Sequence, residues 1–193
     1  MFEYIKGTLV EAAPAYAVVE CGGIGYYISI SVNTYSQIAS NREVMLYLHQ
    51  IVREDAHLLY GFASKEERTI FRQLISVSGI GANTASVMLS SMTVNEITGA
   101  IMTENVNAIK SVKGIGLKTA QRVIIELKDK VNSADYTESS SAGPVATIRE
   151  EALAALVMLG FVKVQAAKVV DKIVAAGGIT SVEELIKRAL KQL

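Results

Sequence analysis

The chain carries the same glycine-containing phrase twice. Segments 77–85 and 112–120 both read Val-x-Gly-Ile-Gly-x-x-Thr-Ala, and their first glycines, Gly79 and Gly114, are 35 residues apart. Each phrase follows an apolar stretch with helical spacing and begins another, which is typical of a helix-hairpin-helix turn. Glycine lets a ligand approach the backbone, and the first amides of the following helix are unpaired at its positive end. The two turns are therefore predicted to bind DNA phosphates, largely without reading sequence.

The candidate contacts are the glycines of each turn and the polar residues that follow them. They are Gly79, Gly81, Asn83 and Thr84 in the first turn, and Gly114, Gly116, Lys118, Thr119 and Arg122 in the second. Lys118 and Arg122 are four residues apart and so share one helix face. The first turn has Asn83 in place of Lys118, and we expect it to bind phosphate more weakly. The alternative is that both turns are plain helix ends, where glycine is also common.

An acidic turn is the second candidate feature. Arg53, Glu54 and Asp55 lie between two strand-like runs and are predicted to project as a hairpin tip. In a DNA-binding protein, two carboxylates at such a tip repel phosphates, which would keep duplexes apart or discourage binding in the wrong place. The plainer interpretation is a solvated turn, which is the commoner use of such residues.

Catalytic chemistry finds little support in the sequence. Residues 116–119 read Gly-Leu-Lys-Thr and lack the glycine directly before lysine, so no ATP site is predicted. His49 and His57 have no partners at metal-ligand spacing, and the adjacent Glu54 and Asp55 would point to opposite sides of a strand. We predict no catalytic residue, no metal site and no cofactor.

An enzyme remains the alternative reading of the paired turns. A helix-hairpin-helix DNA-repair protein, such as a glycosylase or nuclease component, would need a catalytic aspartate beside a base-sized pocket. Asp129 is the only aspartate soon after the second turn, and it falls near a predicted helix end with no evident pocket.

Charge is distributed unevenly along a chain whose formal net charge is zero. The net charge is −3 over residues 1–63, +3 over 64–131, −2 over 132–146 and +2 over 147–193. The positive excess therefore falls on the segment with the two glycine turns, as phosphate binding requires.

Residues 1–63 are predicted to form a β-barrel. Candidate strands, bounded by glycine, proline and asparagine turns, cover 4–11, 16–21, 25–31, 44–52 and 57–62, with a short helix at 34–39. Five short strands and one small helix fit a five-stranded barrel of the OB type. Cys21, the single cysteine, is predicted to be a small buried strand residue.

Residues 64–131 are predicted to form an all-α domain of about five helices. Ser64 is the expected N-cap of the first, with Glu67 at capping-box spacing. Thr93 and Thr103 are expected to begin later helices. The next segment, 132–146, has almost no apolar content and predicts a flexible linker.

Residues 147–193 are predicted to form a small three-helix bundle of the UBA-like type. The helices are expected at 148–159, 163–176 and 181–192. So small a bundle cannot bury every apolar group, and an exposed patch would dock a partner; plain core packing is the alternative. The chain is thus predicted to be a multi-domain α+β protein. It starts like a strand, not a signal peptide, and its longest apolar run is too short to span a bilayer, so we expect a soluble cytoplasmic protein.

Taken together, these features resemble the RuvA family, the Holliday-junction-binding subunits of the bacterial branch migration machinery. The resemblance covers the whole chain. Its most specific parts are segment 52–62 (Val-Arg-Glu-Asp-Ala-His-Leu-Leu-Tyr-Gly-Phe), the pair Glu67-Arg68, the two glycine turns, and segment 151–161 (Glu-Ala-Leu-Ala-Ala-Leu-Val-Met-Leu-Gly-Phe).

The resemblance implies a non-catalytic subunit of an ATP-dependent complex, acting in recombination, repair and the SOS response. RuvA proteins form homotetramers whose positive face holds a four-way DNA junction open, which would place Glu54 and Asp55 at its centre with Arg53 alongside. The third domain would dock on RuvB, the hexameric ATPase that uses the ATP, through Leu156, Leu159 and Phe161. The RuvC resolvase uses the same junction. Whether one tetramer or two clasp the junction stays open.

Two positions depart from the pattern of the family. Relatives often have lysine where this chain has Asn83 in the first turn and Leu117 in the second. Fewer cations release fewer counterions on binding. We therefore expect a lower junction affinity, or a weaker dependence on salt, than in more basic relatives.

Overall fold

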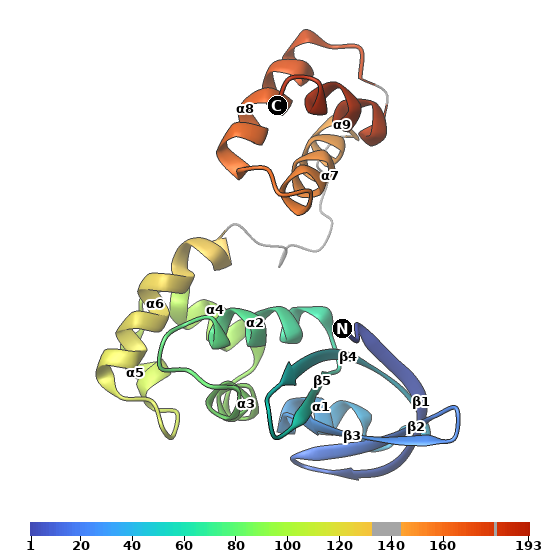
Figure 1. Cartoon of the computed structure of the whole chain (residues 1–193). Helices are drawn as coiled ribbons and strands as arrows, with labels where there is room; N and C mark the ends of the chain where they lie inside the picture. Colours follow the sequence, from blue (N-terminus) through green and yellow to red (C-terminus); the bar gives the residue numbers. More distant parts are fainter. Residues whose placement is uncertain (133–143, 180) are drawn as a thin grey trace. The chain divides into compact units, whose positions relative to one another are not determined.

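The computed structural model describes residues 1–132, 144–179 and 181–193 (Figure 1). The chain divides into two compact units, Met1–Tyr136 and Thr137–Leu193. Most of the predicted linker, residues 133–143 of 132–146, lies outside the described residues. Its last three residues belong to helix α7 instead, which begins at Pro144. Proline is tolerated at the first helical position because its missing N–H would be unpaired there anyway.

A closed five-stranded barrel forms the first part of the first unit, as predicted. Its strands are β1 (Tyr4–Ala13), β2 (Tyr16–Cys21), β3 (Ile24–Ile30), β4 (Glu43–Val52) and β5 (His57–Phe62). They close in the order β1-β2-β3-β5-β4, with β3 and β5 parallel and the other neighbours antiparallel. Helix α1 (Val32–Ile38) connects β3 to β4. Alternate apolar side chains such as Ile28 and Ile30 fill the interior.

The prediction for Cys21 is wrong. The residue ends β2, directly before the Gly22-Gly23 turn, and its side chain is exposed. The pattern of β-strand residues continues to the turn, but the barrel interior has already ended at Val19, which is fully buried.

Residues 64–131, all of them described, form five helices. They are α2 (Lys65–Ile75), α3 (Ala82–Ser91), α4 (Val94–Met102), α5 (Val106–Lys110) and α6, which runs to the end of this part (Leu117–Asn132). Thr93 caps α4 in a complete capping box with Glu96, as an N-cap should. Thr103 does not begin a helix: it is the C-cap of α4, and Asn105 caps α5 by accepting the Ala108 N–H at 3.1 Å.

The barrel interior and the five helices have separate hydrophobic cores, and side chains of β4 and β5 pack into the core of the helices. Phe71 of α2 packs its ring against Tyr60 and Phe62 of β5, at centroid distances of 5.1 and 4.9 Å, and against His49 of β4 at 5.5 Å. No linker intervenes, because Ser64 caps α2 two residues after β5 ends. The segments predicted as separate domains, 1–63 and 64–131, therefore form a single compact unit.

The second unit is the predicted three-helix bundle. It consists of α7 (Pro144–Met158), α8 (Lys163–Ala176) and α9 (Val182–Leu190), shown in orange to red in Figure 1. Its core is small and built mainly from alanine and branched residues: Ala152, Leu156, Ala166, Val170, Ile173, Leu185 and Ala189. Among the described helices of either unit, none is long and apolar enough to cross a membrane.

Candidate nucleic-acid interface

The two glycine turns have the same backbone geometry. Gly79 has a φ of +95° and Gly114 a φ of +92°, a left-handed conformation that favours glycine because it has no Cβ. In both turns the isoleucine N–H donates to the carbonyl of the valine three residues earlier, at 3.0 Å in the first and 3.1 Å in the second. The apolar residues of both phrases are buried: Val77, Ile80, Val112 and Ile115. The repeated sequence therefore specifies a repeated structure.

Each turn presents the start of a helix to its surroundings. The first intrahelical bonds are those from Ala85 N–H to Gly81 O and from Ala120 N–H to Gly116 O, both at 2.9 Å. The amides between these residues precede the first helical bond and have no partner within the helix. Gly81 caps α3 without a side-chain hydrogen bond. An anion can therefore approach these amides at the positive end of the helix dipole.

The two turns lie side by side. The guanidinium of Arg122, on the helix that follows the second turn, donates to the Ser78 carbonyl of the first at 3.3 Å. A side chain at Gly79 would lie 3.8 Å from the Thr119 methyl group. Arg122 also lies 3.8 Å from the Glu126 carboxylate, and its side chain is 52% exposed. Arg122 therefore links the two turns, and its exposed side chain can still contact a ligand. Its four-residue spacing from Lys118 had not predicted the link between the turns.

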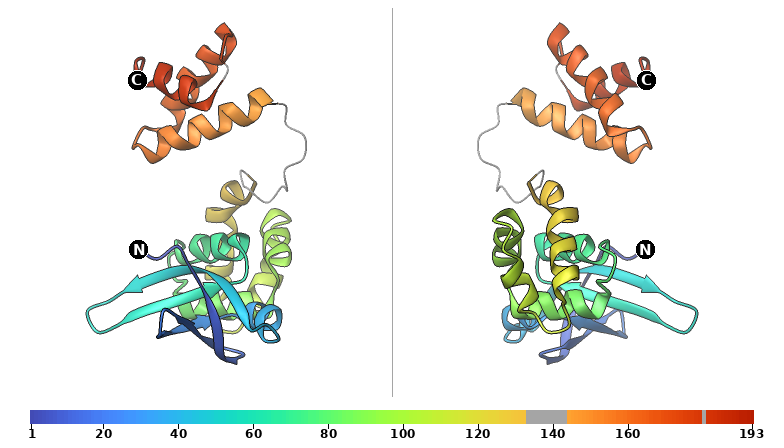
Figure 2. Two further views of the ribbon diagram at one scale, coloured as in Figure 1. Left: turned by 90° about the vertical axis from the view of Figure 1, so that its right-hand side faces the viewer. Right: turned by 90° about the vertical axis from the view of Figure 1, so that its left-hand side faces the viewer.

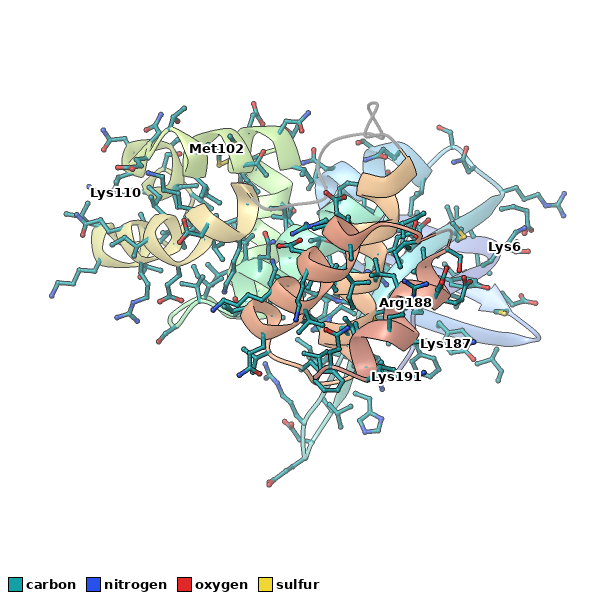
Figure 3. All side chains as sticks on the ribbon, turned by 90° about the horizontal axis from the view of Figure 1, so that it is seen from above. Lys6, Met102, Lys110, Lys187, Arg188 and Lys191 are labelled. Atoms are coloured by element: carbon teal, nitrogen blue, oxygen red, sulfur yellow. The ribbon has the colours of Figure 1, made fainter. Side chains whose placement is uncertain are left out.

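Side chains distinguish the second turn from the first. Lys118 is exposed at the start of α6, one turn before Arg122. Lys110, at the end of α5, and Lys113, within the turn, are also exposed; Figure 3 shows Lys110 pointing outward. Both lysines were missed from the sequence as contributors of charge near the second turn, because only residues on the helix after the turn were considered.

The first turn is attached to the barrel. Asn83 is exposed at the start of α3, and its Oδ1 accepts a hydrogen bond from the Tyr60 hydroxyl at 3.3 Å. Burial raises the pKa of Tyr60, although the Arg53 guanidinium opposes the shift, so the phenol stays protonated and can donate. Thr84 is half-buried. Tyr60 is a residue that sequence reasoning missed, since it precedes Asn83 by 23 positions and lies on a strand.

The acidic turn projects from the barrel as predicted. The last cross-strand pair of β4 and β5 is Val52 with His57, and the Arg53 N–H donates to the Ala56 carbonyl at 2.8 Å. Both views of Figure 2 show this hairpin, in cyan, extending beyond the rest of the first unit. Arg53, Glu54 and Asp55 are exposed at its end. The two carboxylates are therefore exposed at the end of a hairpin whose backbone is hydrogen-bonded up to the turn.

In residues 1–132, 144–179 and 181–193, no group of three or more His, Cys, Asp or Glu side chains could hold a metal ion. Asp129, the candidate aspartate of the enzyme alternative, is exposed on α6.

The residues predicted to dock a partner separate into two groups. Leu156 is fully buried in the core of the second unit, so its side chain is not on the exposed surface, and its docking role stays a prediction. Phe161 is partly buried against that core, and Leu159 is 61% exposed. Apolar neighbours at the end of α7 and the start of α8 extend the exposed surface: Val157, Met158, Val162 and Val164. We call these four residues, with Leu159, the α7–α8 patch.

A second feature of this unit is basic. Lys187, Arg188 and Lys191 lie in the last turn and C-cap of α9 (Figure 3). Arg188 forms an i,i+4 ion pair with Glu184 at 2.6 Å. Cations at this end complement the negative pole of the helix dipole, which accounts for their position.

The fold and the site define a modular helix-hairpin-helix protein, with an OB-type barrel and a small three-helix bundle. Three family descriptions match its parts: "RuvA N terminal domain" over residues 1–61, "SAM-like Helix-hairpin-helix tandem" over 71–129, and "RuvA, C-terminal domain" over 147–193.

Full-length relatives agree with these matches. The chain is 52% identical over 193 residues to a protein of Christiangramia forsetii, 50% over 201 residues to one of Bacteroides thetaiotaomicron, and 49% over 193 residues to one of Flavobacterium psychrophilum. Each comparison covers all of both chains, and each relative is named "Holliday junction branch migration complex subunit RuvA". The chain belongs to the RuvA family.

Proposed function

We propose that the chain binds four-way DNA junctions as a homotetramer, holds them open, and recruits a RuvB ATPase for branch migration in recombination and repair. The names of its full-length relatives support the junction and the complex. The observation that carries the proposal is the pair of adjacent glycine turns on the same compact unit as the projecting acidic hairpin.

Each part of this unit has a separate task in junction binding. The amides after Gly81 and Gly116 hold backbone phosphates, and Lys118 adds positive charge at the second turn. These interactions are the same on any duplex, so they supply affinity without selecting the junction. Four copies on one face of a tetramer multiply a modest positive charge into a strong field.

Selectivity then comes from the acidic hairpin. Glu54 and Asp55 repel a continuous duplex that crosses the middle of the assembly, whereas an open junction leaves its centre unoccupied by stacked base pairs. Arg53, beside them, balances part of this charge. The chain itself needs no ATP, metal or other cofactor for binding; the motor partner hydrolyses ATP, and the RuvC resolvase acts on the junction held open.

The direct test is a gel-shift competition in EDTA at moderate salt. A labelled four-way junction competes with excess linear duplex of the same sequence. Retention on the junction, in stepwise complexes of tetramer size, is the expected result. Loss of the protein to linear duplex would refute junction selectivity and leave a general DNA-binding protein. Base release or cleavage on damaged duplex with Mg²⁺ would instead favour the glycosylase or nuclease alternative.

Neutralising the acidic hairpin tests the origin of selectivity. In Glu54→Gln/Asp55→Asn the repulsion is lost, so duplex affinity should rise about tenfold while junction affinity changes little. Dissociation constants for both DNAs, measured at two salt concentrations, give the ratio. Glu20→Gln, which removes an exposed carboxylate elsewhere on the barrel, is the matched control. An unchanged ratio of the two dissociation constants would show that the hairpin is only a solvated turn.

The α7–α8 patch is proposed to dock the motor. Its exposed apolar residues lie at the end of α7, in the turn that follows and at the start of α8, in a bundle too small to bury them. Leu159 lies in that turn. Phe161 supports the turn from its partly buried position, while Leu156 stabilises the core.

A charge introduced into this patch should abolish docking. In Leu159→Glu the carboxylate would be desolvated at the interface, and affinity for RuvB should fall at least about tenfold. Binding of RuvB to the full chain is measured by calorimetry, with Lys168→Glu on the exposed face of α8 as the control. Equal binding by Leu159→Glu and the control would exclude the patch.

A further inference from the structure

Two consecutive charged residues are buried at the start of α2. Among the residues that the structure describes, Glu67 (4% exposed) and Arg68 (6%) are the buried charged side chains. Burying charge is unfavourable unless hydrogen bonds replace the lost water. Adjacent residues on a helix point about 100° apart, so the two side chains reach different neighbours.

Glu67 connects α2 to α1. Its carboxyl oxygens accept hydrogen bonds from the Ser31 hydroxyl at 2.5 Å and from the Thr34 hydroxyl at 2.6 Å. Ser31 Oγ accepts the Thr34 N–H as the cap of α1, and Thr34 Oγ1 accepts the Ala63 N–H at 3.1 Å. Ser64 still caps α2, but Glu67 is committed to this network instead of a capping box.

Helix α1 in turn is attached to the helix of the first glycine turn. Asn33 Nδ2 donates to the Leu89 carbonyl at 2.6 Å and to the Met92 carbonyl at 3.1 Å. The Val32 N–H donates to Ser90 Oγ at 3.1 Å. These bonds hold the C-terminal end of α3, whose first residues form the phosphate-binding amides. A path of hydrogen bonds therefore joins Glu67 to the C-terminal end of α3, the helix that begins at the first turn.

Arg68 connects α2 to the strand that carries the acidic hairpin. Its guanidinium donates to the Glu3 carbonyl at 2.8 Å and to the Leu48 carbonyl of β4 at 3.4 Å, and it pairs with the Glu3 carboxylate. It also lies 5.4 Å from the centre of the Tyr47 ring, where a cation is attracted. The hydrogen bond from Arg68 lowers the pKa of Glu3. Leu48 is four residues before Val52, where the projecting turn begins.

We propose that Glu67 and Arg68 are positioning residues for junction selectivity. Together they fix the hairpin-bearing β4 and the phosphate-binding α3 in one relative geometry. Affinity for duplex needs only the glycine turns, but selectivity needs the carboxylates at a set place relative to the phosphates. Loosening the network should therefore lower selectivity more than affinity. This inference rests on the proposed function.

The test separates selectivity from affinity. Glu67→Ala removes the acceptor of both hydroxyls, and its junction-to-duplex ratio of dissociation constants should worsen about tenfold. Its duplex affinity should stay within about twofold of the wild type. Glu67→Gln should recover most of the ratio, because the amide can accept from one hydroxyl and donate to the other. Glu66→Ala, which removes an exposed carboxylate from the same turn of the helix, should behave as wild type.

Thermal unfolding of each variant shows whether it is folded before DNA is added. If Glu67→Ala fails to fold, Thr34→Val removes a single hydroxyl with little change of shape, and its ratio should worsen about threefold. A folded variant with an unchanged ratio, or with equal losses on both DNAs, would overturn the inference and leave the network a merely structural role. A wild-type chain without junction preference would instead refute the proposed function, and this inference with it.

Discussion

The two glycine turns have the same backbone conformation but different neighbouring residues. Their φ angles agree within a few degrees, and both begin helices with unpaired amides. The first is held by the barrel, through Tyr60 to Asn83 and through α1 to the end of α3. The second is distinguished by the two cations on its following helix, Lys118 and Arg122.

This difference separates two requirements of a binding site. Amides at a helix start can bind phosphate wherever the turn lies, whereas charged side chains determine how strongly and how salt-dependently it binds. In the proposed function, the first turn has a defined position relative to the acidic hairpin, and the second turn supplies affinity. Arg122 joins them, since it donates to Ser78 of the first turn.

The largest expected effect comes from removing the charge of the second turn. Lys118→Ala/Arg122→Ala should weaken binding to junction and duplex alike by about thirtyfold, since both DNAs present the same phosphates. The salt slope should flatten by about 0.9 for each phosphate that the variant no longer neutralises. Fluorescence anisotropy over a salt series measures both. Lys168→Ala, on an exposed face of the second unit, is the control, and equal affinities of variant and control would remove these residues from the site.

A variant that gives the first turn the cation of the second should change junction affinity by a smaller factor. Asn83→Lys supplies the first turn with the cation that the second has in Lys118, and junction affinity should rise about fivefold with a steeper salt slope. The change also breaks the bond from Tyr60, so Tyr60→Phe measures that loss separately. Asn95→Lys on the exposed side of α4 controls for net charge. A gain no larger than that of Asn95→Lys would show that the first turn does not bind phosphate.

The smallest expected effect is a change of stability with pH. It concerns the contact between α2, the helix before the first turn, and His49 of β4. Burial lowers the pKa of His49, with Arg72 and Arg68 adding to the shift, and its Nδ1 accepts a hydrogen bond from Arg72 at 3.4 Å. Near its ordinary pKa of 6.5, the folded state then binds fewer protons than the unfolded state, so stability is full at higher pH and falls as the pH drops.

Hydrogen exchange, corrected for its intrinsic pH dependence, checks this expectation. Between about pH 7.5 and about pH 5.5 the amides of α2 should lose more protection than those of α6. His49→Asn removes the titrating group and should remove the difference. Equal loss in both helices, or the same loss in His49→Asn, would show that another group is responsible.

Local patterns were sufficient where local interactions decide the structure. The five barrel strands, the N-cap at Thr93 and the repeated glycine turns were confirmed, because each depends on residues close in the sequence. The capping box expected at Ser64 was half right, since Ser64 caps α2 but the Glu67 side chain bonds to α1. Thr103 failed as an N-cap because Asn105, two residues later, competes for the same role. The prediction for Cys21 failed because residue type alone does not give the depth of a side chain.

The sequence by itself determined the parts and their order, since turn chemistry and hydrophobic periodicity depend on short segments, and its motifs carried the resemblance to the RuvA family. Only the tertiary structure decided that the barrel and the paired turns form one unit, and that Tyr60 meets Asn83. It alone showed that the side chains of Glu67 and Arg68 are buried and hydrogen-bond from α2 to α1 and to β4. These hydrogen bonds join residues 20 to 65 positions apart, and no local pattern specifies which distant partner will satisfy a buried charge.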